Sequence, residues 1–300
     1  MSAPKIYFGA GLFSKDQGYN SVEEIKPWLA VLSESKSIIS SIDTAVTYRE
    51  CEEWLGQLKV DAQFGFPIDT KLTGGPHPAL VATKDNIIAQ ARESLSKTGA
   101  KQFGTLYLHA PDPRVPVEET LSGFDALYED GVFKHFGLTY HTSEQVEEVI
   151  KHKISFVAYS PMAGGFLAKT SQQFRHQPES FHGRWDRAGF LGNVYHFLYN
   201  KPPALEALDK WNEIAAAEGI SGEEMAYRWV AYNSALTTDD DMVIGATTIE
   251  QWKSNLAAIQ KGPLSPETAA RIDALWTPEL KKDGILDNFV AIKGAMVSPM

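Results

Sequence analysis

Residues 38–48 read IISSIDTAVTY, a short apolar run that closes with an acidic residue, Asp43. Runs of this length are typical of strands buried on both faces of a parallel sheet. Two later runs end in a similar way, because Lys71 lies near the end of 66–72 and His109 near the end of 105–110. Barrel enzymes hold their chemistry at the carboxyl ends of several strands. These polar strand ends therefore favour a barrel.

On either side of this stretch, short apolar runs predict seven strands in all, and patterns with apolar spacings of three and four predict helices between them. The predicted strands are Lys5–Ala10, Ile38–Thr44, Phe66–Leu72, Thr105–Ala110, Phe133–Tyr140, Ile154–Ser160 and Asp241–Ala246. The predicted helices are Val22–Ser35, Arg49–Gln57, Lys84–Leu95, Pro116–Asp130, Glu144–Lys151 and one that a capping box of Ser221 and Glu224 opens. The regular alternation predicts a single α/β domain over residues 1–300, in which 263–300 form a C-terminal helix and tail.

A doubly wound dinucleotide-binding sheet is the competing architecture. Its only candidate fingerprint is Gly9-Ala10-Gly11, but Ser14 stands at the third glycine position and no acidic residue closes the next strand at the usual spacing. We therefore predict a TIM-type (β/α)8 barrel. Because only seven of its eight strands are visible in the sequence, we expect the barrel to be incomplete or rearranged.

Composition narrows the classes of function. The chain has 300 residues, of which 43% are hydrophobic, and 38 acidic residues outnumber 28 basic ones, for a net charge of -10. This balance argues against nucleic acid or an anionic membrane as a partner. The single cysteine, Cys51, excludes an internal disulfide and a cysteine-based metal cluster, so we expect no metal and a reducing, cytoplasmic location. No signal core or membrane-spanning run is visible.

Four polar side chains predict acid catalysis when they are taken together. Singly, Asp43 could cap a helix, Tyr48 could be a surface aromatic, Lys71 a solvated strand end and His109 a core histidine. Around one barrel mouth they form a proton-donating device. A buried ammonium paired with a carboxylate stays charged and lowers the pKa of an adjacent phenol, while an imidazole holds a substrate oxygen in line.

These residues lie in motifs that resemble the aldo-keto reductases, and within them the aflatoxin-aldehyde-reductase-like branch. The matching stretches are IDTAVTY, TK, LYLHAPDPRVPVEETL, YSPMAGGFL, GRWDRAGFLGNVYHFLYN and VIGATTIEQWKSNLAAI. The resemblance implies an eight-stranded barrel that transfers a hydride from NADPH to the carbonyl of a small substrate. It implies Tyr48 as the general acid, Lys71 as the modulator of its pKa, Asp43 as the partner of Lys71 and His109 as the group that orients the carbonyl.

The resemblance also implies a site for NADP(H). Glycines after a strand let backbone amides approach a pyrophosphate, and a helix N-terminus favours a phosphate. The implied contacts are Ser160, Met162 and Gly164 in the pyrophosphate loop, and Gly245, Thr247, Gln251 and Asn255 at the adenine end. Ala246 and Thr247 supply no basic side chain for the 2′-phosphate, so Lys169 and Arg184 are the nearest substitutes.

One junction departs from the family. Residues 146–160, VEEVIKHKISFVAYS, pass from the fifth-helix pattern directly into a run that resembles the seventh strand. Roughly thirty residues are absent, about one strand-and-crossover unit. With them go the glutamine and tyrosine that hold the nicotinamide in the family, and Thr139-Tyr140 replaces its Ser-Asn pair. Loss of one strand leaves unpaired edges or forces a closure with altered stagger.

Three functions follow from these observations. The first is an NADPH-dependent aldehyde or ketone reductase in which Tyr140 or His141 replaces the lost ring platform, with Trp185 also at the substrate. The second is a redox-neutral dehydratase, isomerase or cyclase that uses Tyr48 and His109 as acid and base. The third is a non-catalytic subunit. The apolar tail 283–300 could cover the barrel mouth or the interface of a homo-oligomer.

Overall fold

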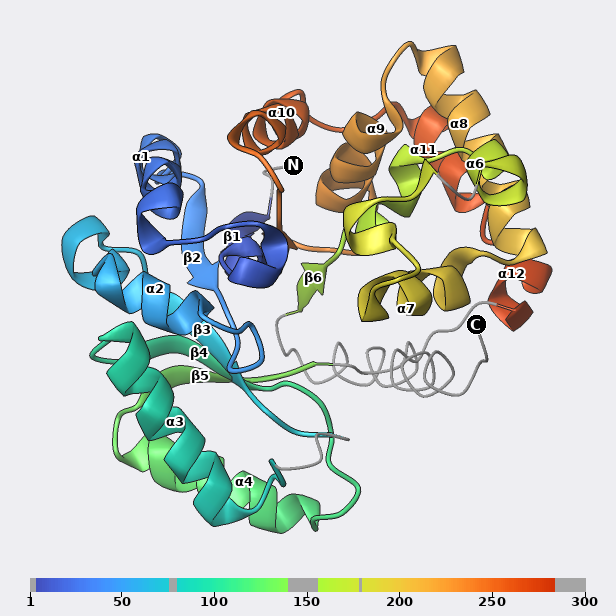
Figure 1. Cartoon of the computed structure of the whole chain (residues 1–300). Coiled ribbons are helices and arrows are strands. Elements are labelled where there is room, and N and C mark those ends of the chain that lie inside the picture. Colours follow the sequence, from blue (N-terminus) through green and yellow to red (C-terminus); the bar gives the residue numbers. More distant parts are fainter. Residues whose placement is uncertain (1–3, 76–79, 140–155, 178–179, 284–300) are drawn as a thin grey trace. The chain divides into compact units, whose positions relative to one another are not determined.

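The computed structural model describes residues 4–75, 80–139, 156–177 and 180–283. Its internal contacts divide the chain into two compact units. The sheet unit contains residues 5–141 and 242–252, and the helical unit contains residues 1–4, 142–241 and 253–300. Figure 1 draws the helices and strands of both units.

Parallel strands form the framework of the sheet unit. In spatial order they are β5 (Phe133–Leu138), β4 (Phe103–Leu108), β3 (Ile68–Leu72), β2 (Ile39–Asp43), β1 (Lys5–Gly9) and β7 (Asp241–Ile244). The pairs from β1 to β5 are all parallel. All five side chains of β3 are buried, as expected for a strand covered on both faces. The α/β class predicted from the alternating pattern is confirmed.

Helices follow the strands of the sheet unit. They are α1 (Lys26–Glu34), α2 (Cys51–Gln57), α3 (Lys84–Thr98) and α4 (Val117–Glu129), with the 3-10 turns η1 (Ala10–Leu12), η2 (Lys15–Gln17) and η3 (Val22–Ile25) and the π-helical turn η4 (Val60–Phe64). The backbone N–H of Asn86 donates to the Thr83 hydroxyl at the start of α3, and Gly99 ends this helix with a φ of 65°. Helices α3 and α4 lie side by side along β3–β5 (Figure 1).

An aromatic cluster forms the core beneath β1. The ring of Phe8 lies 5.6 Å from Phe13, 5.4 Å from Trp28 and 5.1 Å from Trp252, measured between ring centroids. All four side chains are buried. Trp252 belongs to α10 (Ile249–Gln260), which begins in the sheet unit directly after β7. Burial of large aromatic rings stabilises the unit and anchors the start of α10.

The helical unit contains one described strand, β6 (Val157–Tyr159). Its helices are α6 (Ser171–His176), α7 (Phe190–Tyr199), α8 (Pro202–Glu218), α9 (Gly222–Arg228), α11 (Pro266–Asp273) and α12 (Pro278–Asp283), with the 3-10 turns η5 (Ala163–Ala168) and η7 (Gly183–Trp185) and the π-helical turn η8 (Trp229–Asn233). Phe166, Trp185, Leu208, Trp211 and Met225 are among its buried core residues. None of the helices within the described ranges is long and apolar enough to cross a membrane.

The described strands coincide with the seven predicted ones, most at shorter bounds, while β4 begins and ends two residues before the predicted 105–110. The predicted capping box is half formed: the backbone N–H of Glu224 donates to the Ser221 hydroxyl, but the Glu224 carboxylate accepts from Arg228 and Lys261. Those two cations compete successfully for the carboxylate because charged donors bind it more strongly than a backbone amide. The junction at 146–155 lies outside the described residues.

Cys51 is expected to be chemically inert in the folded protein. Its side chain is fully buried, and its thiol donates to the carbonyl oxygen of Ala10 at 3.1 Å. Burial raises the pKa of this thiol to about 12, so the reactive thiolate is scarce at neutral pH. A chromogenic thiol reagent should leave the native protein unlabelled and should label one thiol per chain after unfolding in guanidinium. Rapid labelling of the native chain would contradict this burial.

Candidate active site

The carboxyl ends of β2 and β3 hold a buried ion pair. The ammonium of Lys71 donates to Oδ1 of Asp43 at 2.6 Å and to the carbonyl oxygen of Thr44 at 2.8 Å. Lys71 is 8% exposed and Asp43 is 4% exposed. Both residues end neighbouring parallel strands, which brings their side chains to the same edge of the sheet. The pair therefore fixes the ammonium at the strand ends.

Tyr48 lies in the turn between β2 and α2. Its backbone N–H donates to the carbonyl oxygen of Ala45 at 2.9 Å, which closes the turn. A Cβ placed on Gly11 would lie 3.2 Å from Cε2 of Tyr48, so the ring packs directly over this glycine. The ammonium of Lys71 lies 5.1 Å from the centroid of the Tyr48 ring. Tyrosine and ammonium are thus close enough for the charge to act on the phenol.

His109 follows β4 and faces the same tyrosine. The two rings lie 5.9 Å apart between centroids, at an interplanar angle of 83°. Nδ1 of His109 lies 3.4 Å from the hydroxyl oxygen of Thr47. A hydroxyl that donates to Nδ1 leaves the imidazole proton on Nε2. The sheet unit therefore brings Asp43, Tyr48, Lys71 and His109 together.

Burial and Lys71 set the protonation of this cluster. Burial lowers the pKa of His109 to about 3, helped by the charge of Lys71, so the imidazole is neutral at physiological pH. Burial alone would lower the pKa of Lys71, but Asp43 and Tyr48 raise it to about 12. Burial raises the pKa of Asp43, and Lys71 opposes this. Lysine charged and histidine neutral is the combination that a proton-donating tyrosine needs.

The expected net lowering of the Tyr48 pKa is wrong. Lys71 does act in the predicted direction, but burial of the phenol outweighs it and raises the pKa above the ordinary value of 10.0. Desolvation penalises the phenolate because few solvent dipoles remain to stabilise its charge. Tyr48 therefore holds its proton across the physiological range and can release it only to a group that becomes basic during a reaction.

Sequence reasoning missed three residues of this cluster. Thr47 contacts His109, Tyr107 of β4 lies with its ring centroid 5.8 Å from the ammonium of Lys71, and Asp69 is buried two residues before Lys71 on β3. Alternate residues of a strand share one face, so Asp69 and Tyr107 could have been found by stepping back two positions from Lys71 and His109. Gly137 makes room for Tyr107, because a Cβ there would lie 2.1 Å from its ring.

The predicted pyrophosphate loop follows β6 in the helical unit. Ser160, Ala163 and Gly164 have positive φ values of 54°, 49° and 65°. The indole N–H of Trp185 donates to the carbonyl oxygen of Gly164 at 2.8 Å, and a Cβ on Gly164 would lie 2.8 Å from the Tyr195 ring. Successive residues that alternate in hand form concave turns suited to anions. Met162 lies inside this loop.

The basic residues expected at the 2′-phosphate also lie in the helical unit. The ammonium of Lys169 lies 5.1 Å from the Trp185 ring centroid and 5.5 Å from that of Phe181. Burial lowers the pKa of Lys169. Arg184 is an exposed residue of η7. Trp185, predicted at the substrate, is buried in the aromatic core of this unit, and Tyr140 and His141 lie outside the described residues.

The predicted adenine end begins after β7, where Gly245 leads into α10. The Gln251 side-chain oxygen accepts from the backbone N–H of Thr247 at 2.9 Å and from its hydroxyl at 2.6 Å. The Thr248 hydroxyl in turn accepts from the backbone N–H of Gln251 at 3.1 Å. Thr248 thus caps the start of the helix, and the Gln251 side chain holds Thr247 against its first turn. Asn255 lies one turn further along α10, where its side chain hydrogen-bonds Tyr227.

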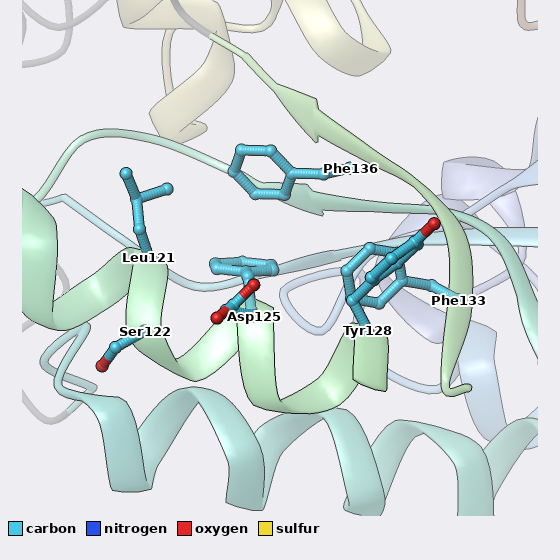
Figure 2. Close-up of a pocket in the computed structure, with 7 residues that line it drawn as sticks. Leu121, Ser122, Asp125, Tyr128, Phe133 and Phe136 are labelled. Atoms are coloured by element: carbon cyan, nitrogen blue, oxygen red, sulfur yellow. The ribbon is translucent and has the colours of Figure 1, made fainter. Parts of the chain in front are cut away.

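A separate groove of about 400 Å³ lies between α4 and β5 in the sheet unit. Figure 2 shows Leu121 and Tyr128 of α4 facing Phe133 and Phe136 of β5, with the Asp125 carboxylate beside them. Its lining contains no basic side chain and none of the four clustered residues. An apolar wall with a carboxylate does not suit the phosphates of a dinucleotide.

Comparison with known proteins identifies the family. The model of the "Aldo/keto reductase family" matches residues 5–155 and 150–277. The two matched stretches meet at 150–155, within the junction where the sequence predicts a lost strand. The resemblance to this family is therefore confirmed, and relatives named aflatoxin B1 aldehyde reductase confirm the branch.

Two curated proteins illustrate the similarity. "Oxidoreductase sirO" of Leptosphaeria maculans is 29% identical, over 91% of this chain and 94% of its own length. That alignment runs over 319 positions, more than the 300 residues of this chain, so part of the relative has no counterpart here. "Aflatoxin B1 aldehyde reductase member 2" of Mus musculus is 28% identical, over 79% of this chain and 76% of its own length.

The solved structure of the glycerol dehydrogenase AKR11B4 from Gluconobacter oxydans shares the fold. It covers 94% of this chain and 92% of its own, with a TM-score of 0.66 at 20% identity. The predicted TIM-type barrel class is confirmed by this likeness. The family model also matches this chain over most of its length. The chain therefore belongs to the aldo/keto reductase family of oxidoreductases.

Proposed function

We propose that this protein reduces the carbonyl group of a small aldehyde or ketone to an alcohol with NADPH. The cluster of Asp43, Tyr48, Lys71 and His109 at the strand ends carries the proposal, because it places a protonated phenol between a fixed cation and a neutral imidazole. The family assignment supports the reaction class. The name of the aflatoxin aldehyde reductases among its relatives supports an aldehyde.

In the proposed mechanism Tyr48 is the general acid. As a carbonyl carbon gains a hydride, its oxygen becomes strongly basic and takes the phenolic proton of Tyr48. The phenolate that remains is stabilised by the ammonium of Lys71, which Asp43 holds in place. One hydride and one proton together convert the carbonyl into the alcohol. The proton of Tyr48 is then restored from solvent.

His109 orients the carbonyl in the same mechanism. Because its pKa is held near 3, the neutral ring donates one hydrogen bond without competing with Tyr48 as an acid. Thr47 contacts Nδ1 of this ring at 3.4 Å, and in the proposed mechanism a ring N–H of His109 donates to the carbonyl oxygen. Two donors converging on one oxygen restrict the substrate to a reactive orientation.

The residues proposed to hold the cofactor are those that the family resemblance implies. NADPH, when bound, supplies the hydride. Ser160, Met162 and Gly164 would hold its pyrophosphate, because the positive φ of Ser160 and Gly164 on either side of Met162 makes a turn of alternating hand, which suits an anion. Gly245, Thr247, Gln251 and Asn255 would contact the adenosine, and Lys169 or Arg184 the 2′-phosphate, whose charge is the reason to prefer NADPH over NADH.

Titration with NADPH, followed by cofactor fluorescence, tests this proposal. We expect saturable binding in the micromolar range and loss of NADPH absorbance when a panel of aldehydes and ketones is added. Gly164→Ala should weaken binding roughly tenfold or more, because its Cβ meets the Tyr195 ring and its φ is 65°. Gly219→Ala is the matched control, since that residue has the same φ but an open surrounding.

The outcomes separate the candidate functions. Absence of NADPH binding up to millimolar cofactor would overturn the reductase proposal. Binding without turnover of any carbonyl compound would instead support a non-catalytic subunit. Turnover of a carbonyl compound in the absence of any nicotinamide, lost in Tyr48→Phe, would support a redox-neutral acid-base enzyme.

A further inference from the structure

A second buried carboxyl group lies beside the ion pair. Asp69 is only 1% exposed, and it precedes Lys71 by two residues, so both side chains leave the same face of β3. The parallel register pairs Asp69 directly with Asp43 of β2. The two carboxyl groups are therefore neighbours across adjacent strands, inside a region from which water is excluded.

Asp69 accepts few hydrogen bonds for an ionised carboxylate. Oδ1 accepts from the backbone N–H of Thr105 on β4 at 2.5 Å. Oδ2 is buried and has no hydrogen-bond partner within the described residues. The Ser41 hydroxyl donates to the carbonyl oxygen of Pro67 at 3.0 Å and also lowers the pKa of Asp69. An ionised carboxylate seeks several donors, whereas a protonated one needs fewer.

Among the described residues, Lys71 is the cation that acts on both of these carboxyl groups. The titratable side chains that interact with Asp69 include Asp43 from β2, Lys71 from its own strand and Tyr107 from β4, and Tyr7 of β1 acts on Tyr107 in turn. Lys71 is already committed to Asp43 Oδ1 and to the carbonyl oxygen of Thr44. A single ammonium balances one buried carboxylate, and the second is costly to ionise.

We propose that Asp69 is a positioning residue that controls how much of the Lys71 charge acts on Tyr48. When Asp69 is protonated, Lys71 serves Asp43 and the phenol alone. When Asp69 ionises, its negative charge offsets part of the electrostatic effect of the Lys71 ammonium on the phenol. Tyr48 then becomes a weaker acid. The inference rests on the proposed function and predicts that carbonyl reduction slows as Asp69 loses its proton.

The pH range of this effect is set by the surroundings. Burial raises the pKa of Asp69 to about 7, and the Ser41 hydroxyl and the Thr105 amide oppose it only in part. Neither His109, with a pKa of about 3, nor Lys71, with a pKa of about 12, changes charge near neutrality. Asp43 and Asp69 titrate as a coupled pair, which a substitution at Asp69 separates.

The test compares kcat/KM for one carbonyl substrate between about pH 6 and 9 in the wild type, Asp69→Asn and Asp125→Asn. We expect the wild-type value to fall by roughly threefold to tenfold as the pH rises through about 7, the range for a change of about one unit in the Tyr48 pKa. Asp69→Asn should abolish this fall. The Asp125→Asn variant, which removes an exposed carboxylate of α4, should keep the fall in kcat/KM with pH.

The Asn variant is expected to fold because the amide imitates the protonated acid. In the wild type, a folded-state pKa of about 7 lies above the ordinary 3.8, so the unfolded chain releases its proton first and stability falls as the pH rises between these values. Urea unfolding should show this fall for the wild type relative to Asp69→Asn, without any need for turnover.

Two results overturn the proposal in distinguishable ways. If the wild type turns over and Asp69→Asn keeps the same fall with pH, Asp69 has a structural role alone. If the wild type reduces no carbonyl compound with NADPH at any pH, the proposed function fails and the role of Asp69 in it fails too. A uniform loss of kcat with an unchanged pH profile also counts against a positioning role.

Discussion

Replacing Tyr48 by Phe is expected to lower kcat for carbonyl reduction by about 10²- to 10⁴-fold, the usual contribution of a general acid. The substitution removes only the phenolic oxygen, so the ring still packs over Gly11 and beside His109. NADPH binding should be unchanged, because no cofactor contact is proposed for this side chain. Steady-state loss of NADPH absorbance measures kcat, and cofactor fluorescence measures binding.

Tyr128→Phe is the matched control for this experiment. Tyr128 is an exposed tyrosine of α4, 58% exposed, and it lines the separate groove in Figure 2. Its hydroxyl should contribute nothing to kcat. If Tyr48→Phe retains more than about a third of the wild-type kcat, Tyr48 is not the acid, because solvent cannot replace a positioned proton donor so well.

Replacing Lys71 by Met is expected to have the largest effect on stability, a loss of about 3–5 kcal/mol in the free energy of unfolding. Methionine keeps most of the volume of the lysine side chain, but the buried Asp43 carboxylate loses its only ion-pair partner among the described residues. The kcat should fall with it, since the charge that stabilises the Tyr48 phenolate is gone. Urea unfolding measures the first effect.

The loss of stability should depend on pH. Without Lys71, burial alone acts on Asp43 and keeps its folded-state pKa above the ordinary 3.8. The penalty is therefore smallest below about pH 4, where both states hold the proton, and grows as the pH rises from there towards the folded-state pKa of Asp43. Adding Asp43→Asn to Lys71→Met should recover part of the stability at neutral pH. Equal stability of wild type and Lys71→Met would contradict a buried ion pair.

Much of this fold could be predicted from local patterns in the sequence. The seven strands were predictable because short apolar runs between polar segments leave few alternatives to a buried strand. The meeting of Asp43, Lys71 and His109 was predictable for a related reason: parallel strands present their carboxyl ends at one edge, so polar residues at those ends become neighbours.

The sequence by itself therefore determined the family, the parallel α/β class and the four residues of the proposed acid device. Only the tertiary structure decided how their charges balance. Whether Lys71 or burial governs the pKa of Tyr48 depends on how many protein atoms surround the phenol, and the sequence does not contain that count. The sequence alone does not show that Asp69 lies near this cluster. The strand register shows it, because it places Asp69 opposite Asp43, which accepts from the Lys71 ammonium. Electrostatic effects depend on distance and desolvation, and both arise from packing between strands that lie far apart along the chain.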